Sequence, residues 1–516
     1  MERLLEPVRA AVKAYWTPDL QRAFLTVFFA TLAFSYAAHG FLFANEFFSH
    51  DSVSYFAYSD WGLSFYAGRG RFVIPIYEGI KGGAAAPWLI GLLFVFWMTL
   101  AAFLVIRFLD IRSRAGMILA SGLLCTNMAL TLTGATYVYC LDEYALSLFL
   151  AAAAAFLFRR GGWRAVAGLI PLVLSLGIYQ SYFTVAMCLC MLDCLRRLTG
   201  GETAPSVLRR GIGYLALLAL GFVLYYAAWN GTCLLLGVEL MRMEESVFSG
   251  GLAVLPTLIW KANLRYFRFL AGSGGVLGRV LPVVHVLLAG LLFWRLLRLL
   301  ADRELPLMGR SLLAVLACLL PTAFYSVFIL VPGGAHYLMT FTGEFLYLLP
   351  LLAMEPGVRK RVGSWGRFLL CVLLCVVLWQ HTVFANQAYM KKELEKNSTL
   401  FLAAQIVSRI EAVEGYVPGE TPVAFAGRVD RNSYLNRDRR AFSQLSGWTG
   451  LANNQAATYN LGHYLVDYLY YPLLWDQDRD YASMEEVRAM PVYPAAGSIG
   501  MVDGTVVVKL SEKKEG

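Results

Sequence analysis

Charged residues are scarce in this chain of 516 residues, where Asp, Glu, Lys and Arg together make up only 15%. Soluble domains carry about 25% charged residues, and the 58% hydrophobic content here therefore excludes an ordinary soluble enzyme. Apolar runs of roughly 17 to 25 residues, the length that crosses a bilayer, recur from Phe24 onward. The composition predicts a membrane protein with many spans.

Several motifs of soluble enzymes are also missing. The sequence has no HExxH, GxSxG or P-loop pattern, so metal, hydrolase and nucleotide chemistry lose support. Nine cysteines are present, most of them inside apolar runs and none beyond residue 385, with neither zinc spacing nor a disulfide framework. We expect inert, buried thiols, no metal and no cofactor. The activated substrate would then have to be linked to a lipid, or the energy would have to come from a gradient across the membrane.

The apolar runs predict about eleven transmembrane helices. We place them at 23–44, 88–106, 115–133, 141–158, 165–182, 183–195, 212–236, 280–297, 311–331, 335–354 and 368–385. The sixth is too short to cross unless it shares residues with the fifth.

Arginine and lysine give the orientation, because cytoplasmic loops carry an excess of both. The N-terminus and alternate loops hold 22 of them, whereas the opposite loops hold eight. The N-terminus is therefore expected in the cytoplasm, and an odd number of spans places the C-terminal region outside. The net charge of +9 belongs to the membrane part, so topogenic arginines explain it better than a nucleic-acid partner.

The chain divides into three parts. Residues 1–22 form an amphipathic cytoplasmic lead, 23–385 the membrane region, and 386–516 a small extracytoplasmic α/β domain. That domain is expected to have a helix over 390–413, strands over 421–426 and 504–510, and helical pieces near 484–489. Two long outer loops, 45–87 and 237–279, are rich in aromatic residues and are expected to lie in the membrane interface.

The first candidate site lies in the loop after the first span. Asp51 stands at the membrane surface beside His50, and Arg69 and Arg71 follow as candidate phosphate ligands. An ionisable group near a membrane face is by default a functional hypothesis. A helix cap is an equal alternative for Asp51.

Further polar residues lie at the predicted outer ends of other spans. Asp142 and Glu143 stand where the fourth span begins. For Asp142, a role in catalysis and a role as helix cap are equally plausible interpretations. Tyr179 and Gln180 form a polar break that suits stacking on a sugar ring and hydrogen bonding to its hydroxyls.

Three other groups are weaker candidates. Lys261 and Arg265 share a helical face with Arg268, where contact with lipid headgroups is favoured over phosphate binding. His336 lies at the start of the tenth span, and Glu344 lies eight residues further in. For Glu344, a buried pair with a neighbouring helix is as plausible as a substrate contact.

These features together resemble the serotype-converting O-antigen glucosyltransferase (Gtr) family of bacteria. The resemblance rests on the acidic position after the first span, Gly70-Arg71-x-x-x-Pro75, the aspartate at the start of the fourth span and the Ser175-x-Gly177-x-Tyr179-Gln180 stretch. The family resemblance implies two acidic residues in a row at the acidic position. This chain has His50-Asp51 there, so the family's acidic role can be assigned to Asp51 alone. The family is similar to GT-C glycosyltransferases, which implies a polytopic α-helical membrane enzyme.

The resemblance implies transfer of glucose from a polyprenyl-phosphate (undecaprenyl-type) carrier to a cell-envelope glycan at the outer face of the bacterial inner membrane. Asp51 would be the base and Asp142 would orient a substrate. Arginines would bind phosphate, and a carrier-glucose synthase and a flippase would be functional partners. A lipid-linked-sugar flippase or transporter and an envelope glycan polymerase remain the alternatives; a flippase would place charges at the bilayer midplane.

Overall fold

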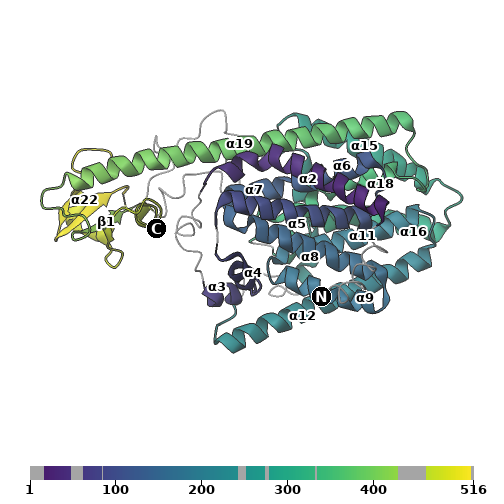
Figure 1. Ribbon diagram of the computed structural model, residues 1–516, viewed down its shortest axis with the longest axis horizontal. Coiled ribbons are helices and arrows are strands. Elements are labelled where there is room, and N and C mark those ends of the chain that lie inside the picture. Colours follow the sequence, from purple (N-terminus) through teal and green to yellow (C-terminus); the bar gives the residue numbers. More distant parts are fainter. Residues whose placement is uncertain are drawn as a thin grey trace, which may run out of the picture.

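The computed structural model describes residues 17–47, 62–83, 85–241, 252–272, 278–331, 334–427 and 461–512. Most of these residues are helical, and the helices of the membrane region run side by side (Figure 1). Within the described residues, eight helical segments are long and apolar enough to cross a membrane. They are α2 (Pro18–Ala44), α5 (Pro87–Phe108), α6 with α7 (Arg114–Cys125 and Met128–Thr136), η1 with α8 (Val138–Cys140 and Leu141–Arg160), α12 (Ala204–Leu236), α15 (Val280–Leu300), α16 (Leu307–Phe324) and α19 (Ser364–Glu411).

Three of the eleven predicted spans consist of shorter helices. The fifth contains α9 (Gly162–Ala167), α10 (Leu169–Leu176) and η2 (Gln180–Tyr182). The sixth is α11 (Phe183–Thr199), and the tenth contains η4 (Tyr337–Met339), η5 (Phe341–Tyr347) and α18 (Leu348–Met354). The membrane-protein class is thus confirmed, and the count of eleven stays a prediction.

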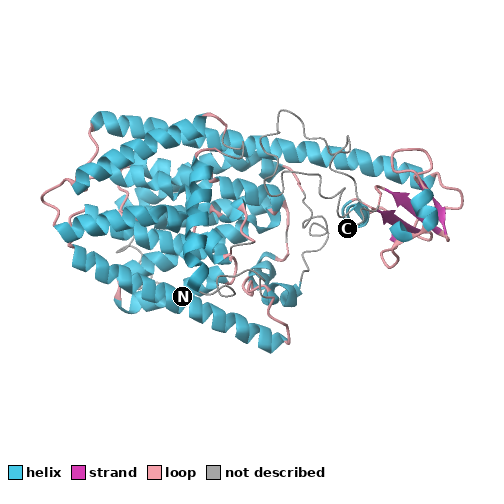
Figure 2. Ribbon diagram, turned by 180° about the vertical axis from the view of Figure 1, so that it is seen from behind, coloured by secondary structure: helices cyan, strands magenta, loops and turns pink. Residues whose placement is uncertain are grey.

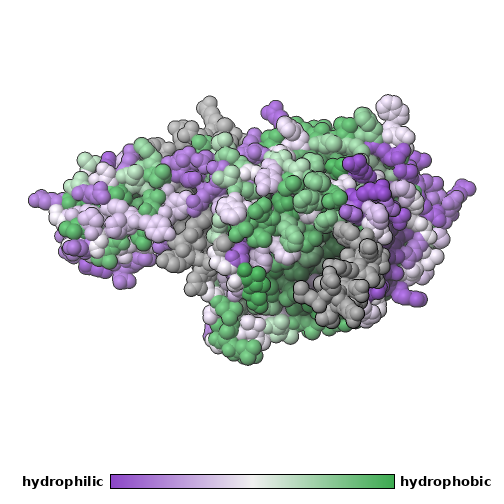
Figure 3. All heavy atoms as spheres, viewed as in Figure 1, coloured by the Kyte–Doolittle hydropathy of each residue, from purple (hydrophilic) through white to green (hydrophobic). Residues whose placement is uncertain are grey.

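Burial differs sharply among the spans. All nine residues of α7 are buried, whereas the outer faces of α12 and α16 expose apolar side chains such as Leu215, Val223, Val315 and Leu319. Figure 3 shows this apolar surface across the middle of the molecule, with polar residues gathered toward its ends. The arrangement fits a bundle whose outer helices face lipid and whose inner helices form the core.

Helix α19 is longer than the sequence predicted. It runs for 48 residues, about 72 Å, through the expected boundary near residue 385. The segment lacks proline, and its only glycine is Gly366 at the start, so nothing interrupts the backbone hydrogen bonds. The predicted last span and the predicted helix over 390–413 are therefore one rod that extends from the bundle (Figure 1).

The C-terminal domain lies at the far end of this rod, as Figure 2 shows from behind. Its four-stranded sheet has the order β2-β1-β4-β3, with β1 (Pro422–Ala426) parallel to β2 (Leu474–Trp475) and to β4 (Thr505–Lys509), and β3 (Ile499–Val502) antiparallel to β4. The two predicted strands are confirmed, and the predicted helical piece is α22 (Glu485–Ala489). Leu402 and Ile406 of α19 pack with Val506 and Val508 of β4, so the rod is part of this core.

Both long loops contain helices in their described parts. The first holds α3 (Gly62–Gly68) and α4 (Ile74–Lys81), at the same end of the bundle as the C-terminal domain (Figure 1). The second holds η3 (Leu252–Val254) and α14 (Leu255–Leu270), which packs against α16 and α17 (Val327–Leu330).

An ion-pair network joins helix ends at the arginine-rich side. Arg196 and Arg159 both pair with Asp110, at 2.9 and 2.5 Å, and both also pair with Asp193. These groups come from three of the loops predicted to be cytoplasmic. Helix α8 spans about 30 Å between this network and the polar residues at its other end.

Candidate functional site

Asp51 and His50 lie outside the described residues, so their predicted roles stay predictions. The described part of the first loop begins at α3, and its α4 helix packs beside the start of α8. Three elements, α4, α8 and the turn between α3 and α4, position the polar groups discussed below.

Lys81 lies at the centre of a buried cluster of three carboxyl groups. Its Nζ is 3.4 Å from Asp142, 3.7 Å from Glu143 and 3.5 Å from Glu78. Glu78 and Lys81 are three residues apart and share one face of α4, while Asp142 and Glu143 occupy the first turn of α8. The side chains of Lys81, Asp142 and Glu143 are at most 2% exposed. We call these four residues the Lys81 cluster.

Asp142 is held at two points. The Tyr77 hydroxyl donates to Asp142 Oδ2 at 3.0 Å, and Lys81 Nζ approaches both carboxylate oxygens. Trp97 Nε1 in turn donates to the Tyr77 hydroxyl. Asp142 is not the N-cap residue, because α8 begins at Leu141 after Cys140 and has no side-chain cap. Asp142 and Glu143 do lie in its first turn, where the helix dipole favours negative charge.

Burial alone would lower the pKa of Lys81. The carboxylates of Asp142, Glu143 and Glu78 more than offset that effect, so the pKa lies above its ordinary value. Lys81 therefore stays protonated and balances one of the three carboxyl charges.

Arg71 stands beside this cluster without a carboxylate of its own. Its guanidinium lies 5.5 Å from the centre of the Tyr179 ring, and its surroundings also include Tyr144, Tyr139 and Cys140. Within the described part of the chain, no acidic side chain pairs with it. A partly buried arginine without a counter-charge is suited to an anionic ligand such as a phosphate.

Two neighbours connect Arg71 to the Lys81 cluster. Tyr66 of α3 and Cys140 of η1 each lie near Arg71 and near the carboxyl groups of Glu78 and Glu143. The structure therefore brings together Arg71, Asp142 and Glu143, which the sequence had placed in two separate groups.

The turn that carries Arg71 depends on Gly70. Its φ of 73° is in the left-handed region, and a β-carbon there would collide with the Tyr225 hydroxyl. Gln180 Nε2 donates to the Arg69 carbonyl at 2.8 Å and lies 2.9 Å from the Tyr225 hydroxyl. Gln180 thus braces this turn, and its amide hydrogens are not free for a sugar. Arg69 stacks on Phe65, 3.6 Å from the ring centre.

Tyr179 is less suited to sugar stacking than the sequence suggested. One face lies on Tyr144, with ring centres 4.0 Å apart, and the residue is only 1% exposed. It instead forms one wall of the site beside Arg71.

Glu344 belongs to a different buried group, at the break between α6 and α7. Glu344 Oε1 accepts a hydrogen bond from Met128 N at 2.9 Å, and Oε2 lies 3.5 Å from His381 Nδ1. On the other side of the break, the Cys125 carbonyl lies 2.8 Å from His39 Nε2. The described contacts of Glu344 are those of the predicted pair with neighbouring helices.

The remaining candidates are spread over the second loop and the tenth span. Arg265 stacks over Phe328 at 4.6 Å, Lys261 is exposed on α14, and His336 is exposed just before η4. None of these three has a described contact with the Lys81 cluster or Arg71.

The described residues contain no group of three His, Cys, Asp or Glu side chains able to hold a metal ion. An Asp-x-Asp pair occurs in the C-terminal domain at Asp476 and Asp478. Asp476 accepts hydrogen bonds from the Tyr481 hydroxyl and from Asp478 N, and its charge is thereby satisfied within its own loop.

Sequence reasoning missed Tyr77, Glu78 and Lys81. Lys81 had been counted only as a loop charge, and single charges in an interfacial segment ordinarily contact headgroups. The available signal was the three-residue spacing of Glu78 and Lys81 directly after the Gly-Arg motif.

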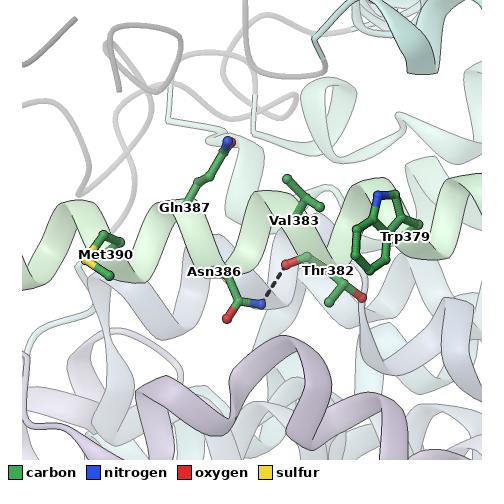
Figure 4. A pocket seen from close by; sticks show the side chains of 6 residues that line it. All are labelled: Trp379, Thr382, Val383, Asn386, Gln387 and Met390. Carbon is green, nitrogen blue, oxygen red and sulfur yellow. Dashed lines mark hydrogen bonds between the residues drawn. The ribbon is translucent and has the colours of Figure 1, made fainter. Parts of the chain in front are cut away.

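An open groove of about 460 Å³ lies on α19 and contains none of the predicted site residues (Figure 4). It is lined by Trp379, Thr382, Val383, Asn386, Gln387 and Met390, and Asn386 donates to the Thr382 carbonyl at 2.8 Å.

Comparison with known proteins identifies the family of the membrane region. No curated protein and no solved structure matches the chain. A family model described as glucosyl transferase GtrII matches residues 40–349, which is more than half of the chain and includes Arg71 and the Lys81 cluster. The chain belongs to the GtrII glucosyltransferase family and is a membrane glycosyltransferase.

Proposed function

We propose that this enzyme transfers glucose from a polyprenyl-phosphate carrier to a cell-envelope glycan at the outer face of the bacterial inner membrane. The observation that carries the proposal is Arg71, a partly buried cation without a described carboxylate partner beside three carboxyl groups. In this proposal the phosphate of the lipid carrier binds to the Arg71 guanidinium.

The chemistry needs neither a metal nor a nucleotide. The acceptor hydroxyl oxygen forms a bond to C1 of glucose while the bond between C1 and the phosphate oxygen breaks. The phosphate keeps the electron pair, and Arg71 stabilises the growing charge, with Arg69 or Arg265 as a second ligand. Direct displacement inverts the anomeric centre.

A carboxylate must take the proton of the acceptor hydroxyl. In our proposal Asp51 is that base, and Asp142, fixed by Tyr77 and Lys81, orients the reacting substrate. The buried Tyr179 shapes the site beside the phosphate, and Gln180 keeps the arginine turn in place.

The proposed sidedness puts α3, α4 and the C-terminal domain outside the cytoplasm and the N-terminus inside. It is supported by the common position of these elements at one end of the bundle, opposite the arginine network (Figure 1). A carrier-glucose synthase and a flippase would supply the donor at that face.

Membranes that contain the protein should transfer label from radioactive polyprenyl-phosphate glucose to an envelope glycan, one sugar per acceptor. Purified, correctly folded Asp51→Asn protein should lose this activity; a wild-type rate would remove Asp51 from the mechanism. Addition of whole repeat units would indicate a polymerase. Movement of the labelled lipid across the membrane without transfer would indicate a flippase.

A further inference from the structure

The Tyr77 hydroxyl lies where three helices meet. Tyr77 stands four residues before Lys81 in α4, so the two side chains share one face of that helix. Trp97 belongs to α5, which packs along α8, and Asp142 stands in the first turn of α8. The Tyr77 oxygen is 3.0 Å from Trp97 Nε1 and 3.0 Å from Asp142 Oδ2. Because Tyr77 and Asp142 are buried, water competes little for these two hydrogen bonds.

The chemistry of the three groups fixes the direction of both hydrogen bonds. An indole N–H can only donate, so the Tyr77 oxygen is the acceptor in the bond from Trp97. The phenol proton is then left for Asp142, whose Oδ2 accepts it. The donors therefore run in one sense, from Trp97 through Tyr77 to the Asp142 carboxylate, and each bond polarises the next.

Lys81 does not fix the orientation of the Asp142 carboxylate by itself. Its Nζ is 3.4 Å from Oδ1 and 3.5 Å from Oδ2, so it favours neither oxygen. The Tyr77 hydroxyl, in contrast, bonds to Oδ2 at the shorter distance of 3.0 Å. Turning the plane of the carboxylate would break that bond and leave a buried phenol O–H without its acceptor, which is costly.

We propose that Tyr77 is a positioning residue for glucosyl transfer: oriented by the Trp97 N–H, its hydroxyl holds the Asp142 carboxylate in the geometry that the reaction uses. The contact of Asp142 with substrate rests on the proposed function above. Tyr77 and Trp97 act through Asp142 and do not themselves touch the reacting atoms. A displacement of about 1 Å in such a group costs roughly a hundredfold in rate, so loss of the hydroxyl affects mainly kcat.

The first test removes the Tyr77 oxygen and keeps its ring. Tyr77→Phe should lower kcat roughly ten- to a hundredfold, while KM for the lipid donor changes less than about threefold. The matched control is Tyr214→Phe, because the Tyr214 hydroxyl donates to the buried Asp193 at 2.8 Å in the arginine network at the other end of the bundle. That control should lower thermal stability to a similar extent and leave kcat unchanged. A wild-type kcat in Tyr77→Phe, or equal losses of kcat in the two variants, would overturn the proposal.

Double substitutions test whether the three residues act as one chain. Trp97→Phe keeps an aromatic ring to stack on Phe149 and removes the N–H, so it should lower kcat less than Tyr77→Phe does. Because Trp97 acts through Tyr77, the double variant Trp97→Phe/Tyr77→Phe should be no slower than Tyr77→Phe alone. In an Asp142→Asn background, assayed at high enzyme concentration, Tyr77→Phe should cost less than about twofold. Losses that multiply in either pair would show that Tyr77 acts independently of its neighbours, against the proposal.

A measurement without substrate separates this proposal from the proposed function. In protein with isotope-labelled tryptophan, the indole N–H signal of Trp97 is the one that disappears from the NMR spectrum of Trp97→Phe. Loss of its acceptor in Tyr77→Phe should shift that signal, whereas Tyr214→Phe should leave it in place. If the signal shifts but the wild-type protein transfers no glucose from the lipid donor, only the proposed function fails. An unshifted signal in Tyr77→Phe would mean that the chain of hydrogen bonds does not exist, and the positioning role fails with it.

Discussion

At the scale of single residues, the site is an unusual balance of charges at the end of a membrane bundle. Arg71 and Asp142 were predicted from local motifs, and the structure brings them to one place. The three-residue spacing of Glu78 and Lys81 was the only sequence signal for Lys81, and its contacts with Asp142 and Glu143 depend on the packing of α4 against α8. Gln180 was predicted to hydrogen-bond a sugar. In the structure its amide nitrogen donates to the Arg69 carbonyl of the arginine turn and to the Tyr225 hydroxyl.

Replacement of Arg71 should weaken binding of the phosphate donor. A hydrogen bond to a charged group contributes about 1.5–3 kcal/mol, so Arg71→Ala should raise KM for the lipid donor roughly ten- to a hundredfold. Arg71→Lys should recover only part of this loss, because lysine lacks the bidentate geometry of arginine. The exposed Arg303, at the arginine-rich end, is a matched control, and Arg303→Ala should leave KM unchanged. Equal KM values for wild type and Arg71→Ala would exclude Arg71 as a phosphate ligand.

Replacement of Lys81 should destabilise the protein. Lys81→Met leaves buried carboxylates without their cation, which costs about 3–5 kcal/mol. The exposed ion pair of Arg22 with Asp19 is the control, where Arg22→Met should cost at most about 1 kcal/mol. Thermal unfolding in detergent measures both.

The ion pairs of Lys81 with the buried carboxylates also predict that the stability of the protein depends on pH. The pKa of Lys81 is raised on folding, so its stabilisation is complete below the ordinary lysine value of about 10.4 and is lost as pH rises through the folded value. Wild-type stability should therefore fall at strongly alkaline pH, and Lys81→Met should lack that component. Identical alkaline profiles would show that the ion pair adds no stability.

At the scale of elements, the long apolar helices were predictable and the breaks between short ones were not. Hydropathy located α2, α5, α8, α12 and α15 because each is apolar over a full span. It could not show that the third span breaks after Cys125, since no proline or glycine marks that point. Tertiary partners satisfy the exposed backbone groups there: His39 at the Cys125 carbonyl and Glu344 at the Met128 N–H.

Glu344 should therefore matter for stability through its acceptor oxygen rather than its charge. Glu344→Gln keeps an acceptor for the Met128 N–H and should cost less than about 1 kcal/mol. Glu344→Leu leaves a buried donor unsatisfied and should cost about 1–3 kcal/mol in thermal unfolding. A Gln variant with normal stability but no transferase activity would instead place Glu344 in contact with substrate.

At the scale of the whole molecule, the fold separates a membrane bundle from a domain carried on a 48-residue helix. The position of the sheet at one end, beside the loop helices α3 and α4, agrees with a site that opens away from the arginine network (Figure 1). The sequence predicted this sidedness from its arginines, but it did not predict the rigid connection, because the change in composition near residue 386 resembled a domain linker.

Cysteine labelling can test the sidedness directly, because no cysteine occurs in the C-terminal domain. In a background without the two exposed native thiols, Cys318 and Cys375, a membrane-impermeant maleimide should label Asp478→Cys in intact spheroplasts. Arg303→Cys should be labelled only after the membrane is opened. The reverse pattern would invert the proposed topology.

The most direct test of the central claim uses purified protein in liposomes with a glycan acceptor and two alternative labelled donors, polyprenyl-phosphate glucose and a nucleotide-linked glucose. We expect transfer from the lipid donor alone, without added metal, and a strongly reduced rate for Arg71→Ala at low donor concentration. Transfer from the nucleotide donor alone, or undiminished lipid-dependent transfer by Arg71→Ala, would contradict the account.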